Sequence, residues 1–279
     1  MQLDYTSLAA LLAAAEAAGK PLSELVLAQQ AEELELPPEQ VYDRMARRYA
    51  VMAESAEQGC DPALRSASGL TGGSAAKMKA AVEAGRSLTG PVLGAALTRA
   101  LAVSELNAAM GRIVAAPTAG SCGILPAALL TMEREKGCSR HACIMALFTA
   151  SAVGLVIARN ACLAGAQGGC QAEFGDAAAI ALKNILGLVC DPVAGLVEVP
   201  CVKRNAAGVA GAFVAAELAL AGIPSVIPPD EVILAMKRVG DAMAPALKET
   251  AEGGLAATPT GCRLREELLG RGGWDAALP

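Results

Sequence analysis

The stretch from Ala142 to Ala158, ACIMALFTASAVGLVIA, carries no charged side chain over 17 consecutive residues. A helix of this length is at the short limit for crossing a membrane, and its many Ala, Ser, Thr and Gly residues are only weakly apolar. A second apolar run, which begins at Ala206, is interrupted by Glu217. Central helices of soluble helical proteins have this composition, so we expect a core helix and no association with a membrane.

The rest of the chain also favours helices. Its apolar residues are mostly Ala, Leu, Val and Gly, and aromatic residues make up only 3% of the 279 positions. Only residues 196–199 and 111–114 look extended, and both segments are short. We therefore predict an all-α protein with glycine-rich functional loops at helix ends. Residues 1–60 are more polar and are expected to form a helical arm, and residues 61–279 the catalytic part of the same molecule.

Three polar residues look like helix N-caps. Ser23 is expected to cap a helix that runs to about Glu33. Asn205 is expected to begin a helix from about residue 206 to 220, and Asp230 a helix that runs to Met243.

Charge and cysteine content restrict the partners and the compartment. The net charge is −5 and no run of Lys or Arg is present, so nucleic-acid binding has no electrostatic basis. The first twenty residues contain acidic residues and lack a basic region, unlike signal or transit peptides. Nine cysteines without such a signal indicate a reducing compartment, and we expect a cytoplasmic protein.

Three of the cysteines lie in loop-like surroundings. Cys170 follows two glycines, Cys190 precedes Asp-Pro, and Cys201 follows a proline and precedes Val-Lys-Arg-Asn. Three thiolates close together can hold an iron–sulfur cluster or a zinc ion and leave one position open for a substrate. The spacing lacks C-x₂-C pairs, so spacing alone leaves incidental buried cysteines as the alternative. Cys60, Cys138, Cys143 and Cys162 are expected to be small buried apolar residues.

Two loops rich in glycine and hydroxyl groups each precede a helix-forming segment. They are SASGLTGG, residues 66–73, and PTAGSCG, residues 117–123. Backbone N–H groups in such loops can hold a small anion, although a turn with a helix cap is the simpler interpretation. Cys122 in the second loop is an alternative metal ligand. His141, the one histidine, does not support a histidine-based triad.

The same segments resemble the alpha, or catalytic, subunit of the iron–sulfur-dependent L-serine dehydratases. The similarity is carried by RSASGLTGG, APTAGSCGILPA, GAQGGCQAE, LGLVCDPVAGLVEVPCVKRNA and KETAEGGLA, and extends over nearly the whole chain. It implies a [4Fe–4S] cluster on Cys170, Cys190 and Cys201, with the fourth iron open to the hydroxyl group of the substrate. The implied reaction converts L-serine to pyruvate and ammonia, with iron as a Lewis acid for the leaving hydroxyl. A separate beta subunit is expected to complete the enzyme.

The resemblance also suggests where the substrate binds. We expect it near Ser66, Ser68, Thr71, Gly72, Gly73, Thr118, Ala119, Gly120, Ser121 and Asn205, with Lys203 and Arg204 as further polar candidates. Lys77 and Glu173 are candidates for the catalytic base, and a residue of the partner subunit is the alternative. Cys262 is either a fourth cluster ligand when substrate is absent or an exposed thiol.

Besides Cys262, the chain departs from the family pattern at two places. The family usually has an additional helix and turn where residues 176–180 directly join GCQAEFG to the helix before Cys190. Ser74 stands where an acidic residue is expected after GLTGG. Two other functions fit the cysteines: a non-catalytic cluster- or metal-binding helical protein, and a related iron–sulfur cysteine desulfidase.

Overall fold

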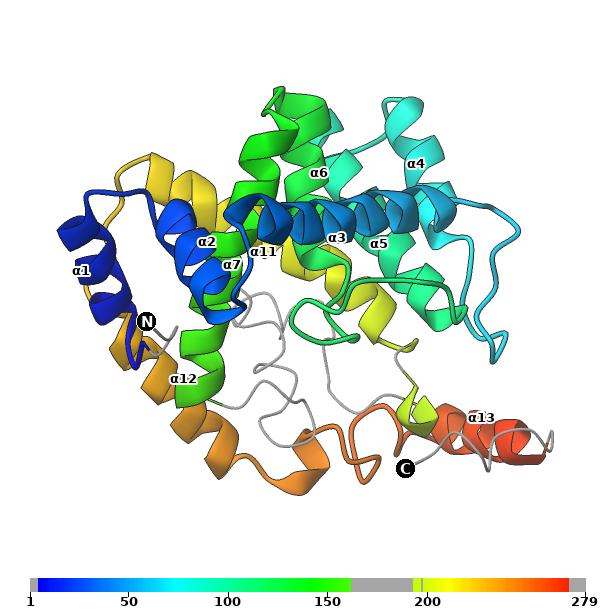
Figure 1. Cartoon of the computed structure of the whole chain (residues 1–279). Coiled ribbons are helices and arrows are strands. Elements are labelled where there is room, and N and C mark those ends of the chain that lie inside the picture. The colour runs from blue at the N-terminus through cyan, green and yellow to red at the C-terminus, as the bar shows by residue number, and fades with distance from the viewer. Residues whose placement is uncertain (1–4, 162–192, 197, 271–279) are drawn as a thin grey trace.

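The computed structural model describes residues 5–161, 193–196 and 198–270. All regular structure in these ranges is helical (Figure 1), which confirms the predicted all-α class. The segments that look extended, 111–114 and 196–199, form no strand among the described residues. The elements are α1 (Leu8–Ala18), α2 (Leu22–Glu33), α3 (Pro38–Gln58), α4 (Ser74–Glu83), α5 (Gly90–Ala108), α6 (Ile124–Lys136), α7 (Arg140–Asn160), the short helical turn η1 (Val193–Gly195), α11 (Cys201–Leu220), α12 (Pro229–Ala242), the turn η2 (Pro245–Leu247) and α13 (Pro259–Gly270).

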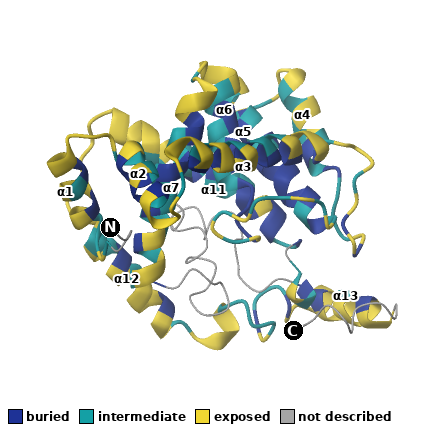
Figure 2. Ribbon diagram, in the orientation of Figure 1, coloured by how far each residue is buried: buried dark blue, intermediate teal, exposed yellow. Residues whose placement is uncertain are grey.

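The largest group of packed apolar side chains joins the first three helices to α6 and α7. Tyr49 of α3, Leu130 of α6 and Phe148 of α7 are completely buried within it. The uncharged stretch of the sequence forms most of α7. One face of this helix packs in the core, as the dark buried residues in Figure 2 show, whereas Leu155 is 43% exposed. Among the described helices, α7 is long and apolar enough to cross a membrane by length and composition.

Helix α5 lies at the centre of the part that carries the site, where it packs against α3, α4, α6 and α11. Close approach is possible because the contacting residues are small. A Cβ at Gly59 would lie 1.9 Å from the carbonyl oxygen of Ala102, and one at Gly123 would lie 2.4 Å from that of Ala100. Glycine at these two positions therefore lets the end of α3 and the start of α6 touch the backbone of α5.

The three predicted N-caps are wrong, because a proline begins each helix earlier. Pro21, Pro200 and Pro228 precede α2, α11 and α12, so Ser23, Asn205 and Asp230 lie inside these helices. Proline favours such positions because its fixed φ suits the start of a helix and its missing N–H is not needed there. Asp230 caps a different helix: its carboxylate accepts hydrogen bonds from the amides of Leu8 (2.7 Å) and Ala9 (3.0 Å) at the start of α1.

Candidate functional site

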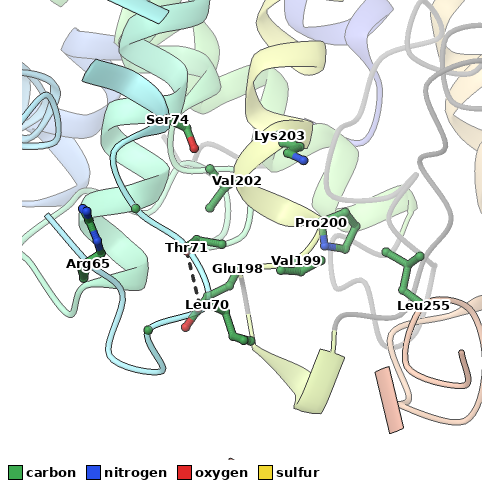
Figure 3. Close-up of a pocket in the computed structure, with 12 residues that line it drawn as sticks. Arg65, Leu70, Thr71, Ser74, Glu198, Val199, Pro200, Val202, Lys203 and Leu255 are labelled. Atoms are coloured by element: carbon green, nitrogen blue, oxygen red, sulfur yellow. Dashed lines mark hydrogen bonds between the residues drawn. The ribbon is translucent and has the colours of Figure 1, made fainter. Parts of the chain in front are cut away.

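A cavity of about 520 Å³ lies between the loop that precedes α4 and the first turn of α11. This volume falls in the range of small-molecule binding sites. Figure 3 shows its lining, which consists of Arg65, Gly69, Leu70, Thr71, Gly72, Ser74, Glu198, Val199, Pro200, Val202, Lys203 and Leu255. Two segments that are far apart in the sequence, 65–74 and 198–203, thus supply all but one of the residues around it.

Glu198 connects these two segments. The hydroxyl of Ser68 donates a 2.6 Å hydrogen bond to its Oε2, and the hydroxyl of Thr71 donates a longer one of 3.4 Å to the same oxygen. The Oγ of Ser66 lies 3.3 Å from that of Ser68, and the amides of Leu70 and Thr71 donate to Ser68 and Ser66. The hydroxyl groups that we expected near the substrate therefore bind a carboxylate of the protein.

The start of α4 is also occupied by a protein carboxylate. Glu105 of α5 is 1% exposed, and its two oxygens accept hydrogen bonds from the amides of Ser74 (2.8 Å) and Ala75 (3.0 Å). An acid near a helix N-terminus satisfies unpaired amides and interacts favourably with the helix dipole. Ser74 itself lacks the acidic group expected after GLTGG, and Glu105 places one at the same helix end from a neighbouring helix.

Asn205 holds the second glycine-bearing loop against α11. Its side chain is completely buried: Oδ1 accepts from the amide of Gly123 (2.8 Å), and Nδ2 lies within hydrogen-bonding distance of the oxygens of Gly120 (2.8 Å), Cys201 (3.0 Å) and Ser104 (3.1 Å). An amide can accept at its oxygen and donate twice at its nitrogen, so this side chain is fully used within the protein. Asn205 positions the loop and the first turn of α11.

Cys201 is the described member of the proposed ligand set. It is 2% exposed at the start of α11, where a helix N-terminus favours a thiolate. The guanidinium of Arg204 donates from Nη1 to Cys201 Sγ at 3.9 Å and to Glu249 at 3.2 Å. These surroundings suit a metal-binding sulfur. Cys122, by contrast, is completely buried, and burial raises the pKa of its thiol to about 12.

The other predicted site residues fall into three groups. Ser66, Ser68, Thr71, Gly72 and Gly73 are in the loop at the cavity, and Lys203 is in its wall. Thr118, Ala119, Gly120 and Ser121 belong to the loop that Asn205 holds, where the Oγ atoms of Thr118 and Ser121 lie 3.1 Å apart, and none of the four lines the cavity. Lys77 and Cys262 are exposed away from the lining, whereas Cys170, Cys190 and Glu173 lie outside the described residues.

Two buried acids near the cavity, Glu198 and Glu105, are not among the residues that the sequence predicted. Glu198 stands three residues before Cys201 in VEVPC, so an acid beside a metal-ligand candidate was the available signal. Glu105 gave no such signal, because it lies inside a helix and accepts hydrogen bonds from the amides of residues that lie 31 and 30 positions earlier.

Comparison with known proteins supplies the family. The model of the serine dehydratase alpha chain matches residues 17–181 and 174–256. The chain belongs to the serine dehydratase alpha chain family. The probable L-serine dehydratase alpha chain of Bacillus subtilis is 46% identical over 271 residues, which cover 89% of this chain and 90% of that protein. The L-serine dehydratase alpha chain of Peptoniphilus asaccharolyticus is 45% identical, with 67% and 72% of the two chains covered.

A longer relative shows similarity to this chain in only part of its length. The L-serine dehydratase of Streptomyces coelicolor is 39% identical over 187 residues, which cover 58% of this chain and 41% of that protein. The matched part of this chain thus corresponds to less than half of that relative.

The comparison also bears on the short junction near Asp176. The family match is divided into two segments that meet at residues 174–181. The alignment with the Bacillus subtilis relative spans 271 positions. The 89% of this 279-residue chain that takes part in it is fewer residues than that, so some aligned positions have no residue from this chain. That relative therefore has residues that this chain lacks, and the division of the family match is at the junction itself.

Proposed function

We propose that this chain is the alpha subunit of an L-serine dehydratase, a lyase of serine catabolism that produces pyruvate and ammonia. The family membership supports the reaction class. The cavity at the start of α11 is the observation that links this reaction to particular residues. Cys201 stands between two of its lining residues, Pro200 and Val202, in the sequence. A substrate in this cavity would lie beside a sulfur ligand.

We further propose that Cys201, together with Cys170 and Cys190, holds a [4Fe–4S] cluster. The burial of Cys201, its place in the first turn of α11 and the guanidinium of Arg204 beside its sulfur support this ligand assignment. When bound, such a cluster would supply a Lewis-acidic iron that stabilises the departing hydroxide of serine, which is a poor leaving group near neutral pH.

The protein's own residues would bind and orient the amino acid. Lys203 and Arg65 are the cationic residues in the described lining, and their charges suit the substrate carboxylate. Arg65 is itself positioned by hydrogen bonds from Nη1 to the carbonyl oxygens of Pro62 and Leu64. Removal of the α-proton needs a base, for which Lys77 is poorly placed because it is exposed on α4 away from the lining.

We propose a beta subunit as the partner and the cytoplasm as the location. The names of the Bacillus subtilis and Peptoniphilus asaccharolyticus relatives, each an alpha chain, support a second type of chain. An open iron and nine cysteines in 279 residues both suit a reducing compartment.

The experiment is anaerobic purification of the chain with and without a beta chain of the family. Iron, sulfide and visible absorbance are measured beside pyruvate formation from L-serine, L-threonine and L-cysteine. We expect a brown complex that forms pyruvate from L-serine and loses this activity in air. A brown complex without activity would support a cluster-binding protein instead, and sulfide release from cysteine as the main reaction would support a desulfidase.

A further inference from the structure

Glu198 is a buried acid whose described hydrogen bonds all fall on one of its two oxygens. Its side chain is 4% exposed, and both Ser68 and Thr71 donate to Oε2. No described residue forms an ion pair with Glu198 or a hydrogen bond with its Oε1. Burial of a carboxylate is costly unless a cation or several donors compensate it. Since Glu198 lines the cavity, a bound ligand can supply the missing partner.

The hydroxyl groups around Glu198 are arranged as donors toward it. Ser68 has a single hydroxyl proton and uses it in the 2.6 Å bond to Glu198, so the 3.3 Å contact with Ser66 requires Ser66 to be the donor. Ser66 in turn accepts from the amide of Thr71. Each bond in this series points its proton toward the carboxylate, which is the arrangement that an ionised acid requires.

The charges of the cavity complement an amino-acid zwitterion. In the view of Figure 3, Arg65 and Lys203 lie on either side of Glu198. An α-amino acid carries an ammonium and a carboxylate on the same carbon, so the acid and the cations of the lining can bind its two groups together. An α-hydroxy acid would present only its carboxylate to the cations and leave Glu198 without a cationic partner.

We propose that Glu198 binds the α-ammonium group of the substrate and thereby selects α-amino acids over α-hydroxy acids. This inference rests on the proposed dehydratase function, because it assigns a residue to the recognition of that substrate. The role is one of binding and specificity: Oε1 receives the ammonium, while Ser68 and Thr71 hold Oε2.

The test compares Glu198→Gln with the unchanged protein in the anaerobic complex of alpha and beta chains. The probes are L-serine and L-glycerate, which differ in having an ammonium or a hydroxyl on the α-carbon. Loss of one charge-assisted hydrogen bond should raise the KM for L-serine by about 10- to 100-fold. The inhibition constant of L-glycerate should change by less than about twofold, because its uncharged α-hydroxyl can donate to a glutamine oxygen as well as to a carboxylate. Glu16→Gln, an exposed change on α1, is the matched control and should alter neither constant.

Other outcomes would overturn the assignment. An unchanged KM with a kcat lowered by orders of magnitude, together with lost exchange of the α-proton with solvent, would make Glu198 the base. Equal weakening of L-serine and L-glycerate would indicate a purely structural role. Ser68→Ala removes the shortest bond to Glu198 and provides a second variant, for which we expect a smaller rise in KM and the same selectivity for L-serine.

The assignment and the proposed function can fail separately. If the unchanged complex binds L-serine but makes no pyruvate, the dehydratase proposal fails, and calorimetric binding of L-serine and L-glycerate to the Glu198→Gln complex still tests the ammonium site. If the unchanged complex binds L-glycerate as tightly as L-serine, the ammonium site is wrong whether or not pyruvate forms.

Discussion

Cys201 differs from Cys122 in its polar surroundings, although both thiols are buried. The first has a guanidinium beside its sulfur and begins a helix, whereas burial is the main cause that raises the pKa of the second. We expect Cys201→Ala to abolish the visible absorbance of the cluster and most of the bound iron, because only two of the proposed ligands remain. Cys122→Ala is the buried control and Cys262→Ala the exposed one, and both should retain iron. Full iron content in the Cys201 variant would remove this residue from the ligand set.

The buried side chain of Asn205 makes several hydrogen bonds within the protein. Asn205→Ala leaves the amide of Gly123 and the carbonyls of Gly120 and Cys201 without this partner. We expect a loss of about 3–5 kcal/mol in the free energy of unfolding, measured with urea, since each unsatisfied buried group costs about 1–3 kcal/mol. Asn107→Ala is the control, because Asn107 makes one exposed bond to the same loop, at Ala119. Equal losses in the two variants would contradict the central role of Asn205.

At the scale of single elements, α4 shows how one helix end depends on another helix. Both oxygens of Glu105 accept amides of α4, and Glu105→Gln replaces one of these acceptors by an NH₂ group that faces an amide donor. We expect this variant to lose about 2–3 kcal/mol in the free energy of unfolding, because a buried charge-assisted bond is replaced by a donor–donor contact.

The control for this change is Glu83→Gln at the other end of α4, where the acid is exposed and 4.0 Å from Lys79. A surface pair of this kind contributes at most about 1 kcal/mol. Urea unfolding of the two variants separates the contributions, and an unchanged unfolding midpoint for Glu105→Gln would show that α4 does not need this cap.

Helix identity was predictable from the sequence, and the partners of helix ends were not. The pattern of apolar residues and the scarcity of extended segments were sufficient for an all-α fold. The pattern of the 66–73 loop predicted a binding site, but the bond from Ser68 to Glu198 joins residues 130 positions apart. Such pairings arise from tertiary packing, which the local sequence does not encode. The predicted caps are wrong for a local reason, because a proline begins each of these helices earlier in the chain.

At the scale of the whole molecule, the short junction at residues 174–181 lies between two of the proposed cluster ligands. The length of a connection limits how its two ends can approach each other. We expect that inserting a helix and turn of the kind the family pattern has at this junction increases the iron bound per chain after anaerobic reconstitution. An insertion of equal length rich in Gly and Ser is the control for length alone. Equal iron in the chimera and the original chain would show that the short connection already suffices.

The carboxylate of Asp230 links the two ends of the folded chain, since the amides that it receives belong to α1 and lie more than 220 positions away. A product truncated before α12 would therefore lose two hydrogen bonds at the start of its first helix, where Ser7 would remain as the N-cap, as well as its final helices. Fraying would then begin at the end of the chain opposite to the cut, so an antibody or a protease specific for the first twenty residues would report the loss of the final helices.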